Sequence, residues 1–384
     1  MSYRYDFLVH ATVREEDDWG FPEPDATRVP TDVAALSKLR DSAACAQDLA
    51  ALKLTNYALA VSEAQVRSSH CTAMPISVQA SRDEHCNLAC TYCRSSPPES
   101  YALMSWSDWE SALEVLLPPA IEFLPFCWGE PLIAPGLRET LELAARNRVT
   151  VSLITNLQAM TSELAESFVR FVGRALISVD TADPAAFQRI RRGGSLAALE
   201  RNLDALDDAA ARPGLSRPWL GVSAVMMRST IGGLPRLIRW MSTRGLRGLC
   251  AKRIILRSHE LQKSQQDELF AFSSREYREV YRECHSLCRS LGIALSMCDP
   301  DRPVGIHTSC PAPWQHIYLS PSGHMSVCNF SRLRTVGALP LCEGYYNSEQ
   351  IVAMRRSWAV GHRCPECQSS DCDGRNEFPG ARGY

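Results

Sequence analysis

The sequence lacks both a large net charge and a long apolar run. Its 41 Lys and Arg residues nearly balance 43 Asp and Glu residues, which leaves a formal charge of −2. Such a balance gives no electrostatic footprint for nucleic acid or for an anionic membrane, so we expect neither as a partner. No apolar stretch approaches the ~20 residues that a membrane helix needs. The first residues become acidic where a secretion signal would be apolar, and we therefore expect a cytoplasmic protein.

Cysteine, in contrast, is abundant, with 16 residues in a chain of 384. The cytosol keeps thiols reduced, so a disulfide framework is not expected, and metal ligation or ordinary burial remains. Cys284 and Cys288 share one face of an expected helix, where packing is favoured over a pair of ligands. Five cysteines stand alone in the sequence and are expected to be buried as small hydrophobic side chains: Cys45, Cys71, Cys127, Cys250 and Cys342.

The pattern of the sequence divides the chain into three parts. Residues 1–74 contain a proline-rich stretch followed by one expected helix from Asp32 to Val66. Residues 75–295 alternate between strand and helix patterns. In residues 296–384 the helical periodicity fades, and Gly, Pro and Cys become frequent. We expect a mostly helical N-terminal extension, a central α/β domain and a small cysteine-rich C-terminal domain.

Six strand-then-helix units follow one another in the central part. Strands are expected over Ile76–Ala80, Ile121–Cys127, Val149–Thr155, Ala175–Asp180, Trp219–Met226 and Lys252–Leu256. Helices are expected over Trp106–Leu117, Leu137–Arg146, Ser162–Phe171, Leu196–Ala211, Leu234–Arg244 and Arg275–Leu291. This alternation predicts a parallel sheet with right-handed crossovers. Six units suit a partial (β/α)6 TIM-like barrel, in which chemistry takes place at the carboxyl ends of the strands.

Three cysteines stand in one short loop after the first expected strand, in the segment Cys86-Asn-Leu-Ala-Cys90-Thr-Tyr-Cys93. Cysteine thiolates hold iron–sulfur clusters, usually with four ligands to a cluster. Three ligands leave one iron of a four-iron cluster open, so the loop suggests a bound cofactor. Structural zinc sites usually have four protein ligands in tighter pairs, which makes zinc the weaker alternative.

Further residues extend the match beyond the cysteines. Tyr92 occupies the aromatic position before the third cysteine, Cys127-Trp-Gly-Glu-Pro131 ends the second strand, and Arg191-Arg-Gly-Gly-Ser195 follows the fourth. Over residues 75–260 the chain thereby resembles the radical S-adenosylmethionine (SAM) superfamily. Members of this family carry a CxxxCxφC loop and a Gly-Gly-Glu-Pro motif on a partial (β/α)6 barrel. One departure is Trp128, which replaces the first glycine of the motif.

The resemblance implies a cofactor site. Cys86, Cys90 and Cys93 would hold a [4Fe–4S] cluster, and the amine and carboxylate of SAM would chelate its open iron. The implied SAM contacts are Tyr92 near the adenine, Gly129 and Glu130 around the amino group, Ser178 and Arg191 at the ribose and carboxylate, and Asn156 as a weaker candidate. An arginine suits a carboxylate because its planar fork can bind both oxygens.

A second group of cysteines lies in the C-terminal part. Cys310, Gly323 and Cys328 form a Cx12Gx4C arrangement, which resembles the twitch or SPASM extension of many radical SAM enzymes. The pattern stops too early for SPASM, so the shorter twitch form is expected. It would hold one auxiliary [4Fe–4S] cluster on Cys310, Cys328, Cys364 and Cys367. Cys298 or Cys372 could replace one of these ligands, and a zinc knuckle on the same four thiolates is the alternative.

The family's chemistry implies an oxidoreductase or tailoring enzyme. Reductive cleavage of SAM would give a 5′-deoxyadenosyl radical that abstracts a substrate hydrogen, with an electron donor such as flavodoxin or ferredoxin. A fully ligated auxiliary cluster could only relay electrons or support the structure, which favours net oxidation or cross-linking. No catalytic residue that acts on the substrate can be named from the sequence.

The substrate class is left open between two candidates. The helical character of residues 1–74 differs from the strand–helix leader-binding domains of peptide-modifying relatives. It favours oxidation or epimerisation of a small molecule of secondary metabolism, such as a sugar, an aminoglycoside or a nucleoside. The alternative is a peptide substrate that is cross-linked, epimerised or matured as in a sulfatase. A hypothesis of another class is a non-catalytic zinc-binding scaffold.

Overall fold

The computed structural model describes residues 33–93, 103–254, 267–271, 274–301, 311–327, 337–339, 341 and 344–360. Cys310, Cys328, Cys342, Cys364, Cys367 and Cys372 lie outside these ranges. Nothing below therefore concerns the expected ligands of an auxiliary cluster.

A ten-stranded sheet forms the centre of the protein, in the order β12-β11-β10-β1-β3-β4-β5-β7-β8-β9. The strands from β10 through β1 to β9 are parallel, and β11 and β12 continue the edge in antiparallel fashion. Their bounds are β1 Ser77–Ala80, β3 Glu122–Leu124, β4 Thr150–Thr155, β5 Val172–Ser178, β7 Trp219–Met226, β8 Gly248–Arg253, β9 Ala294–Ser296, β10 His316–Leu319, β11 His324–Ser326 and β12 Gly337–Ala338.

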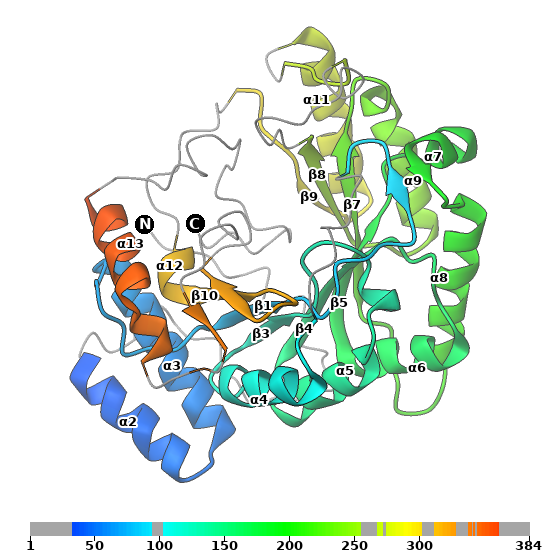
Figure 1. Cartoon of the computed structure of the whole chain (residues 1–384). Helices are drawn as coiled ribbons and strands as arrows, with labels where there is room; N and C mark the ends of the chain where they lie inside the picture. The colour runs from blue at the N-terminus through cyan, green and yellow to red at the C-terminus, as the bar shows by residue number, and fades with distance from the viewer. Residues whose placement is uncertain are drawn as a thin grey trace.

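Helices connect the parallel strands and lie outside them (Figure 1). Each helix buries an apolar face against the sheet, and these faces form one continuous core with the strands. This packing fixes the position of each connecting helix on the sheet. Among the described residues, no helix combines the length and apolar character required to cross a bilayer. The bounds are α4 Trp106–Leu116, α5 Leu137–Arg146, α6 Ser162–Phe171, α7 Pro184–Ile190, α8 Leu196–Ala210, α9 Leu234–Thr243 and α11 Arg275–Ser290, with short 3-10 turns η1 Pro131–Ile133 and η2 Ile231–Gly233.

The expected partial barrel of six strand-then-helix units is confirmed. The units are β1–α4, β3–α5, β4–α6, β5–α8, β7–α9 and β8–α11. Helices α5 and α6 and strand β7 have the predicted bounds. Strand β8 begins at Gly248, four residues before its predicted start, because the buried segment Gly248–Ala251 belongs to the strand as well. The sheet also continues past residue 295, since β9 spans that position and β10 pairs with β1.

The N-terminal extension contains two helices in place of the single helix expected from Asp32 to Val66. They are α2 Val33–Cys45 and α3 Leu49–Gln65. The chain breaks between them because Gln47 adopts a left-handed φ of 55° and the Asp48 side chain caps α3 by accepting from the Ala51 amide. Helical periodicity on both sides of the break hid it from the sequence analysis. Cys45 ends α2 and is exposed, which corrects the expectation of a buried thiol.

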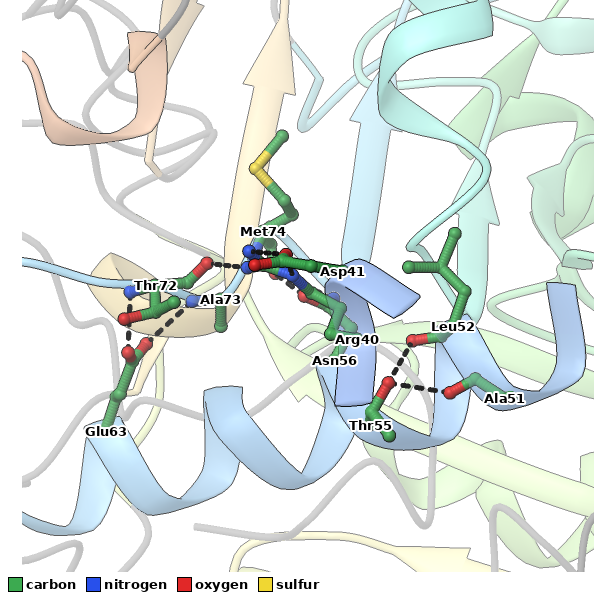
Figure 2. Close-up of polar contacts among 10 residues, drawn as sticks. All are labelled: Arg40, Asp41, Ala51, Leu52, Thr55, Asn56, Glu63, Thr72, Ala73 and Met74. Atoms are coloured by element: carbon green, nitrogen blue, oxygen red, sulfur yellow. Dashed lines mark hydrogen bonds and ion pairs between the residues drawn. The ribbon is translucent and has the colours of Figure 1, made fainter. Parts of the chain in front are cut away.

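Helix α3 holds the segment that leads into β1 (Figure 2). The Asn56 side chain donates to the Met74 carbonyl at 3.1 Å and accepts from the Met74 amide at 2.8 Å. The Glu63 carboxylate accepts from the Thr72 and Ala73 amides at 2.6 and 3.1 Å. Because these side chains replace strand partners that residues 72–74 lack, they fix where β1 starts.

The same helix reaches the connection before β3. The Lys53 ammonium donates to the Leu117 carbonyl at 3.0 Å and to the Ala120 carbonyl, and Asn56 donates to the Pro119 carbonyl at 3.1 Å. Lys53 and Asn56 are almost completely buried. The extension therefore closes the end of the barrel at which β1 and β3 begin, opposite to the end that carries the three-cysteine loop.

The C-terminal helices α12 Ala312–Gln315 and α13 Glu349–Ala359, with the short turn η4 Tyr345–Asn347, pack beside α3 (Figure 1). The Trp314 indole donates to the Ser68 carbonyl at 2.7 Å, and the Asn347 side chain makes two hydrogen bonds with the backbone of Cys71. Chain segments from both ends of the sequence therefore meet at this side of the sheet.

A buried ionic network crosses the strands within the barrel. The Arg174 side chain of β5 is paired with Glu122 of β3 and donates to the Ser152 hydroxyl of β4 at 2.7 Å. Ser77 of β1 donates to Glu122 at 3.3 Å. Since every charged group has a partner, the network is compatible with burial.

Candidate functional site

The three-cysteine loop lies at the carboxyl end of β1 and is fixed by a small second sheet. Strand β2 Ala89–Cys90 pairs antiparallel with β6 Arg191–Arg192, which places Cys90 opposite Arg191. The Thr91 amide extends the pairing by donating to the Ile190 carbonyl at 2.9 Å. The sequence analysis did not predict this sheet, because two-residue strands carry no periodicity. It brings together two motifs that are a hundred residues apart in the sequence.

The thiols have polar neighbours that suit a negatively charged sulfur. Cys86 Sγ accepts from the Leu88 amide at 3.4 Å and lies 3.7 Å from Asn156 Nδ2, while Arg191 Nη1 lies 4.0 Å from Cys90 Sγ. Cys86 and Cys93 are exposed, and Cys90 is half-buried. Burial raises the pKa of the Cys90 thiol to about 11 and raises that of Cys86 as well. Thiols bind metal as thiolates, so binding of a cluster by this loop would release protons.

The loop fits an iron–sulfur cluster better than a single metal ion. Within the described residues, no three His, Cys, Asp or Glu side chains are gathered closely enough to hold one ion. A zinc ion draws its sulfur ligands to about 2.3 Å, whereas each thiolate of a four-iron cluster binds a different iron. After burial, the charge on Cys93 also contributes to raising the pKa of both Cys86 and Cys90. Three thiols within one short loop suit the cluster.

Gly129 presses the turn after β3 against the cysteine loop. Its φ is +84°, and a Cβ atom at this position would lie 2.5 Å from the His85 carbonyl oxygen. The next amide, that of Glu130, donates to the same oxygen at 2.8 Å. Only glycine allows this approach, so the Gly-Glu-Pro turn positions the residue that precedes Cys86.

The Glu130 carboxylate joins the ends of β3 and β4. It accepts from the Leu132 amide at 3.1 Å, from the Thr155 hydroxyl at 2.5 Å and from the Asn156 amide at 2.6 Å. Burial raises its pKa to about 7, although these three hydrogen bonds act in the opposite direction. The carboxylate thereby holds Asn156, whose side chain donates to Asn87 of the cysteine loop at 2.8 Å.

Asp180 is a site residue that the sequence analysis missed. Its carboxylate is buried and accepts from the Tyr92 hydroxyl at 3.0 Å, from Arg191 Nη2 at 3.1 Å and from the Val225 amide at 2.8 Å. The signal was present in the segment Ile177-Ser-Val-Asp180, because alternate residues of an extended chain share a side. Ser178 is the half-buried last residue of β5 at the same edge of the sheet, with Ser223 opposite it on β7.

Cys127 and Trp128 lie at the carboxyl end of β3 and are half-buried. The expectation of a buried Cys127 is wrong, because this residue lies in the turn after β3 and is half-buried; its side chain forms a hydrogen bond with that of Tyr318 on β10. Tyr318 in turn donates to the Glu84 carboxylate at 3.0 Å, two residues before Cys86. By contrast, Cys71, Cys250, Cys284 and Cys288 are buried as expected. Cys298 is also buried, and its carbonyl accepts from the Tyr277 hydroxyl at 2.5 Å.

These features define a class of protein, a partial α/β barrel with a three-thiol loop and a ring of polar groups at the carboxyl edge of its strands. Residues 83–220 match the model of the radical SAM superfamily, so this segment of the chain is similar to a radical SAM domain. The matched domain and the relatives described next indicate an enzyme, of the family that binds a [4Fe–4S] cluster and SAM.

Two curated relatives match the chain at low identity. The chain is 26% identical over 290 residues to a GTP 3′,8-cyclase of Caulobacter vibrioides, with 72% of this chain and 77% of the relative covered. It is 26% identical over 282 residues to GTP 3′,8-cyclase 1 of Pseudomonas aeruginosa, with coverage of 71% and 81%.

Two solved structures share the fold. Streptococcus suis SuiB bound to the precursor peptide SuiA has a TM-score of 0.59 at 12% identity, with 85% of this chain and 75% of that chain covered. Native anSMEcpe with bound SAM has a TM-score of 0.57 at 15% identity, with 73% of this chain and 84% of that chain covered. At these identities the likeness concerns the fold alone.

Proposed function

We propose that Cys86, Cys90 and Cys93 are the ligands of the [4Fe–4S] cluster. The observation that carries this proposal is the convergence of three separate motifs on the cysteine loop. The Gly-Glu-Pro turn fixes the carbonyl of His85, Asn156 contacts Cys86, and Arg191 contacts Cys90. Around them stand the residues proposed to surround SAM: Tyr92, Gly129, Glu130, Asn156, Ser178 and Arg191.

The cluster and SAM together supply one-electron chemistry that removes a hydrogen atom from an unreactive C–H bond. The residues of the chain position and shield this chemistry. The Arg191 guanidinium lies over the ring of Tyr92 in the cysteine loop, with its central carbon 5.7 Å from the ring centre. Glu130 and Asp180 are buried carboxyl groups held by backbone amides, so their positions are fixed in advance and need no rearrangement during turnover.

For the substrate we propose a small molecule, such as a sugar, an aminoglycoside or a nucleoside, that is oxidised or epimerised. The N-terminal extension supports this choice, because α3 packs at the amino ends of β1 and β3, away from the cysteine loop. The sequence relatives that cover most of the chain are also named for a nucleotide substrate. A peptide is the competing candidate, since SuiB and anSMEcpe carry their peptides on the same fold.

The C-terminal part is proposed to complete the enzyme. Residues 296–384 would form a twitch-like domain beside the barrel of residues 75–295, with residues 1–74 as the extension. One auxiliary [4Fe–4S] cluster on Cys310, Cys328, Cys364 and Cys367 would relay an electron during net oxidation. A small donor protein such as flavodoxin or ferredoxin would reduce the enzyme.

The test is anaerobic turnover of the reconstituted, reduced protein with SAM. We expect brown protein that forms 5′-deoxyadenosine, and Cys90→Ala should lose this product completely, whereas Cys45→Ala on exposed α2 should retain it. Colourless protein that contains zinc would establish the scaffold hypothesis instead. Product formation by Cys90→Ala would contradict the ligand assignment.

The substrate and the auxiliary cluster are tested on the same preparation. Sugars, aminoglycosides and nucleosides are compared with peptides by mass analysis for loss of two hydrogens. Wild-type protein should contain roughly eight irons, and Cys367→Ala roughly four. A two-hydrogen loss from peptides alone would make a peptide the favoured substrate in place of the small molecule. An unchanged iron content in Cys367→Ala would show that Cys367 is not a cluster ligand.

A further inference from the structure

The guanidinium group of Arg191 is held in a way that leaves few of its N–H donors for a ligand. Its Nη2 donates to Asp180 Oδ1 at 3.1 Å, and its Nε forms an ion pair with Asp180 Oδ2 at 2.9 Å without hydrogen-bond geometry, so one edge of the guanidinium faces this carboxylate. Nη1, which the other two-donor edge requires, lies 4.0 Å from Cys90 Sγ. Both residues are nearly inaccessible, with exposed fractions of 5% for Arg191 and 1% for Asp180.

Asp180 itself is fixed from three sides. Besides Arg191 it accepts from the Tyr92 hydroxyl on the cysteine loop and from the Val225 amide on β7. The pairing of β2 with β6 places the backbones of Cys90 and Arg191 opposite each other, and the ion pair with Asp180 holds the guanidinium in place. A positive charge is therefore held rigidly beside one sulfur of the cysteine loop.

We infer that Asp180 is a positioning residue that holds Arg191 against the Cys90 sulfur, and that Arg191 tunes the cluster instead of binding the carboxylate of SAM. This inference rests on the proposed role of Cys90 as a cluster ligand. One-electron reduction makes a cluster more negative, so a fixed guanidinium at a ligand sulfur stabilises the reduced form and raises the reduction potential. A higher potential allows a weaker donor to reduce the enzyme.

The first experiment is a redox titration of the reconstituted protein, followed by the electron paramagnetic resonance signal of the reduced cluster. Arg191→Gln should lower the midpoint potential, and Arg191→Lys should recover part of the loss because it keeps the charge without the fork. Arg189→Gln removes an exposed positive charge from the preceding helix turn and should leave the potential unchanged. A potential that is the same in Arg191→Gln and wild type would overturn the inference.

The variant Asp180→Asn separates two explanations, because they predict shifts of the midpoint potential in opposite directions. If only the net field at the cluster mattered, Asp180→Asn would remove a negative charge and raise the potential. If Asp180 positions Arg191, the same variant should lower the potential, because the guanidinium loses its hold beside Cys90. We expect the lower value, and a rise would contradict the positioning role. Asp180→Glu keeps the charge but displaces the guanidinium, and it should also lower the potential.

The second experiment separates cluster tuning from recognition of SAM. Binding of SAM and of 5′-methylthioadenosine, which lacks the amino-acid group, is compared in wild type and Arg191→Gln. Arg191 as a carboxylate ligand would require a loss of affinity for SAM of tenfold or more with no change for methylthioadenosine. We expect less than a threefold change for both. A wild-type protein that takes up no cluster would refute the proposed function, whereas an intact cluster with unchanged potential would refute only this inference.

Discussion

At the scale of single residues, the site depends on buried carboxylates that serve the backbone and neighbouring side chains. Glu130 receives three hydrogen bonds from the ends of β3 and β4, and Asp180 receives its bonds from the cysteine loop, from β6 and from β7. An unpaired charge at this depth would be strongly unfavourable, so each carboxylate requires all the elements around it to be in place. These two residues thereby join the carboxyl ends of four strands to the loop.

Glu130→Gln is expected to destabilise the protein by roughly 1–3 kcal/mol. Glu130 uses both oxygens as acceptors, and an amide must turn its NH2 group toward one of the same donors. The measurement is chemical denaturation of the cluster-free protein, together with SAM affinity after reconstitution. Glu139→Gln changes an exposed carboxylate in the first turn of α5 and should match wild type. Equal stability of the two variants would show that Glu130 does not hold the strand ends.

At the scale of elements, short connections place the chemistry and long helices supply the support. The two-residue strands β2 and β6 join the cysteine loop to the segment after α7. The turn at Gly129 joins the same loop to β3 through the His85 carbonyl. Since each connection has few hydrogen bonds, the loop depends on close backbone contacts that a single methyl group would break.

Gly129→Ala should therefore displace the cysteine loop. The added Cβ would meet the His85 carbonyl oxygen at 2.5 Å, and alanine is strained at a φ of +84°, together a cost of roughly 1–3 kcal/mol. We expect lower iron incorporation per chain under identical reconstitution. The matched control is Gly232→Ala in η2, where a Cβ meets no atom within 4 Å and φ is not positive. Full iron incorporation by Gly129→Ala would contradict the close approach.

At the scale of the whole molecule, the two ends of the barrel have different tasks. The amino ends of β1 and β3 are closed by α3, with Lys53 and Asn56 buried against backbone carbonyls. The carboxyl ends carry the cysteine loop and the polar residues that converge on it. Because parallel strands hold both ends on one sheet, loss of the closed end would also disturb the site.

The buried Lys53 predicts how stability changes with pH. Burial lowers its pKa from 10.5 to about 7. Between these values the unfolded chain binds a proton that the folded chain lacks, so this residue makes stability rise with pH, by at most about 1.4 kcal/mol per pH unit. Lys53→Met should show a smaller rise than wild type between about pH 7 and pH 8.5, below the titration of the thiols.

The free energy of unfolding in urea, determined across this range, checks the expectation. Lys38→Met on α2 serves as the control, because the side chain of Lys38 is exposed. Parallel pH curves for wild type and Lys53→Met would show that Lys53 keeps its proton in the folded protein.

Much of the central architecture could be predicted because it depends on local pattern. Helices α5 and α6 begin and end where their apolar periodicity begins and ends, and β7 matches its β-branched run. The break at Gln47 could not be predicted, since helix-forming residues stand on both sides of it. Strands β10 to β12 were missed for another reason, because their place in the sheet depends on pairing with β1 across more than two hundred residues.

The sequence by itself determined the class of chemistry. The spacing of Cys86, Cys90 and Cys93 after a strand, with Tyr92 among them, is a local property, and local spacing decides which ligands one short loop can offer. Only the tertiary structure decided how Arg191 is used. Asp180 occupies one edge of its guanidinium and Cys90 lies at the remaining nitrogen, an arrangement that arises when β2, β5, β6 and β7 meet. Contacts between distant segments depend on how the strands pack, which no stretch of sequence encodes alone.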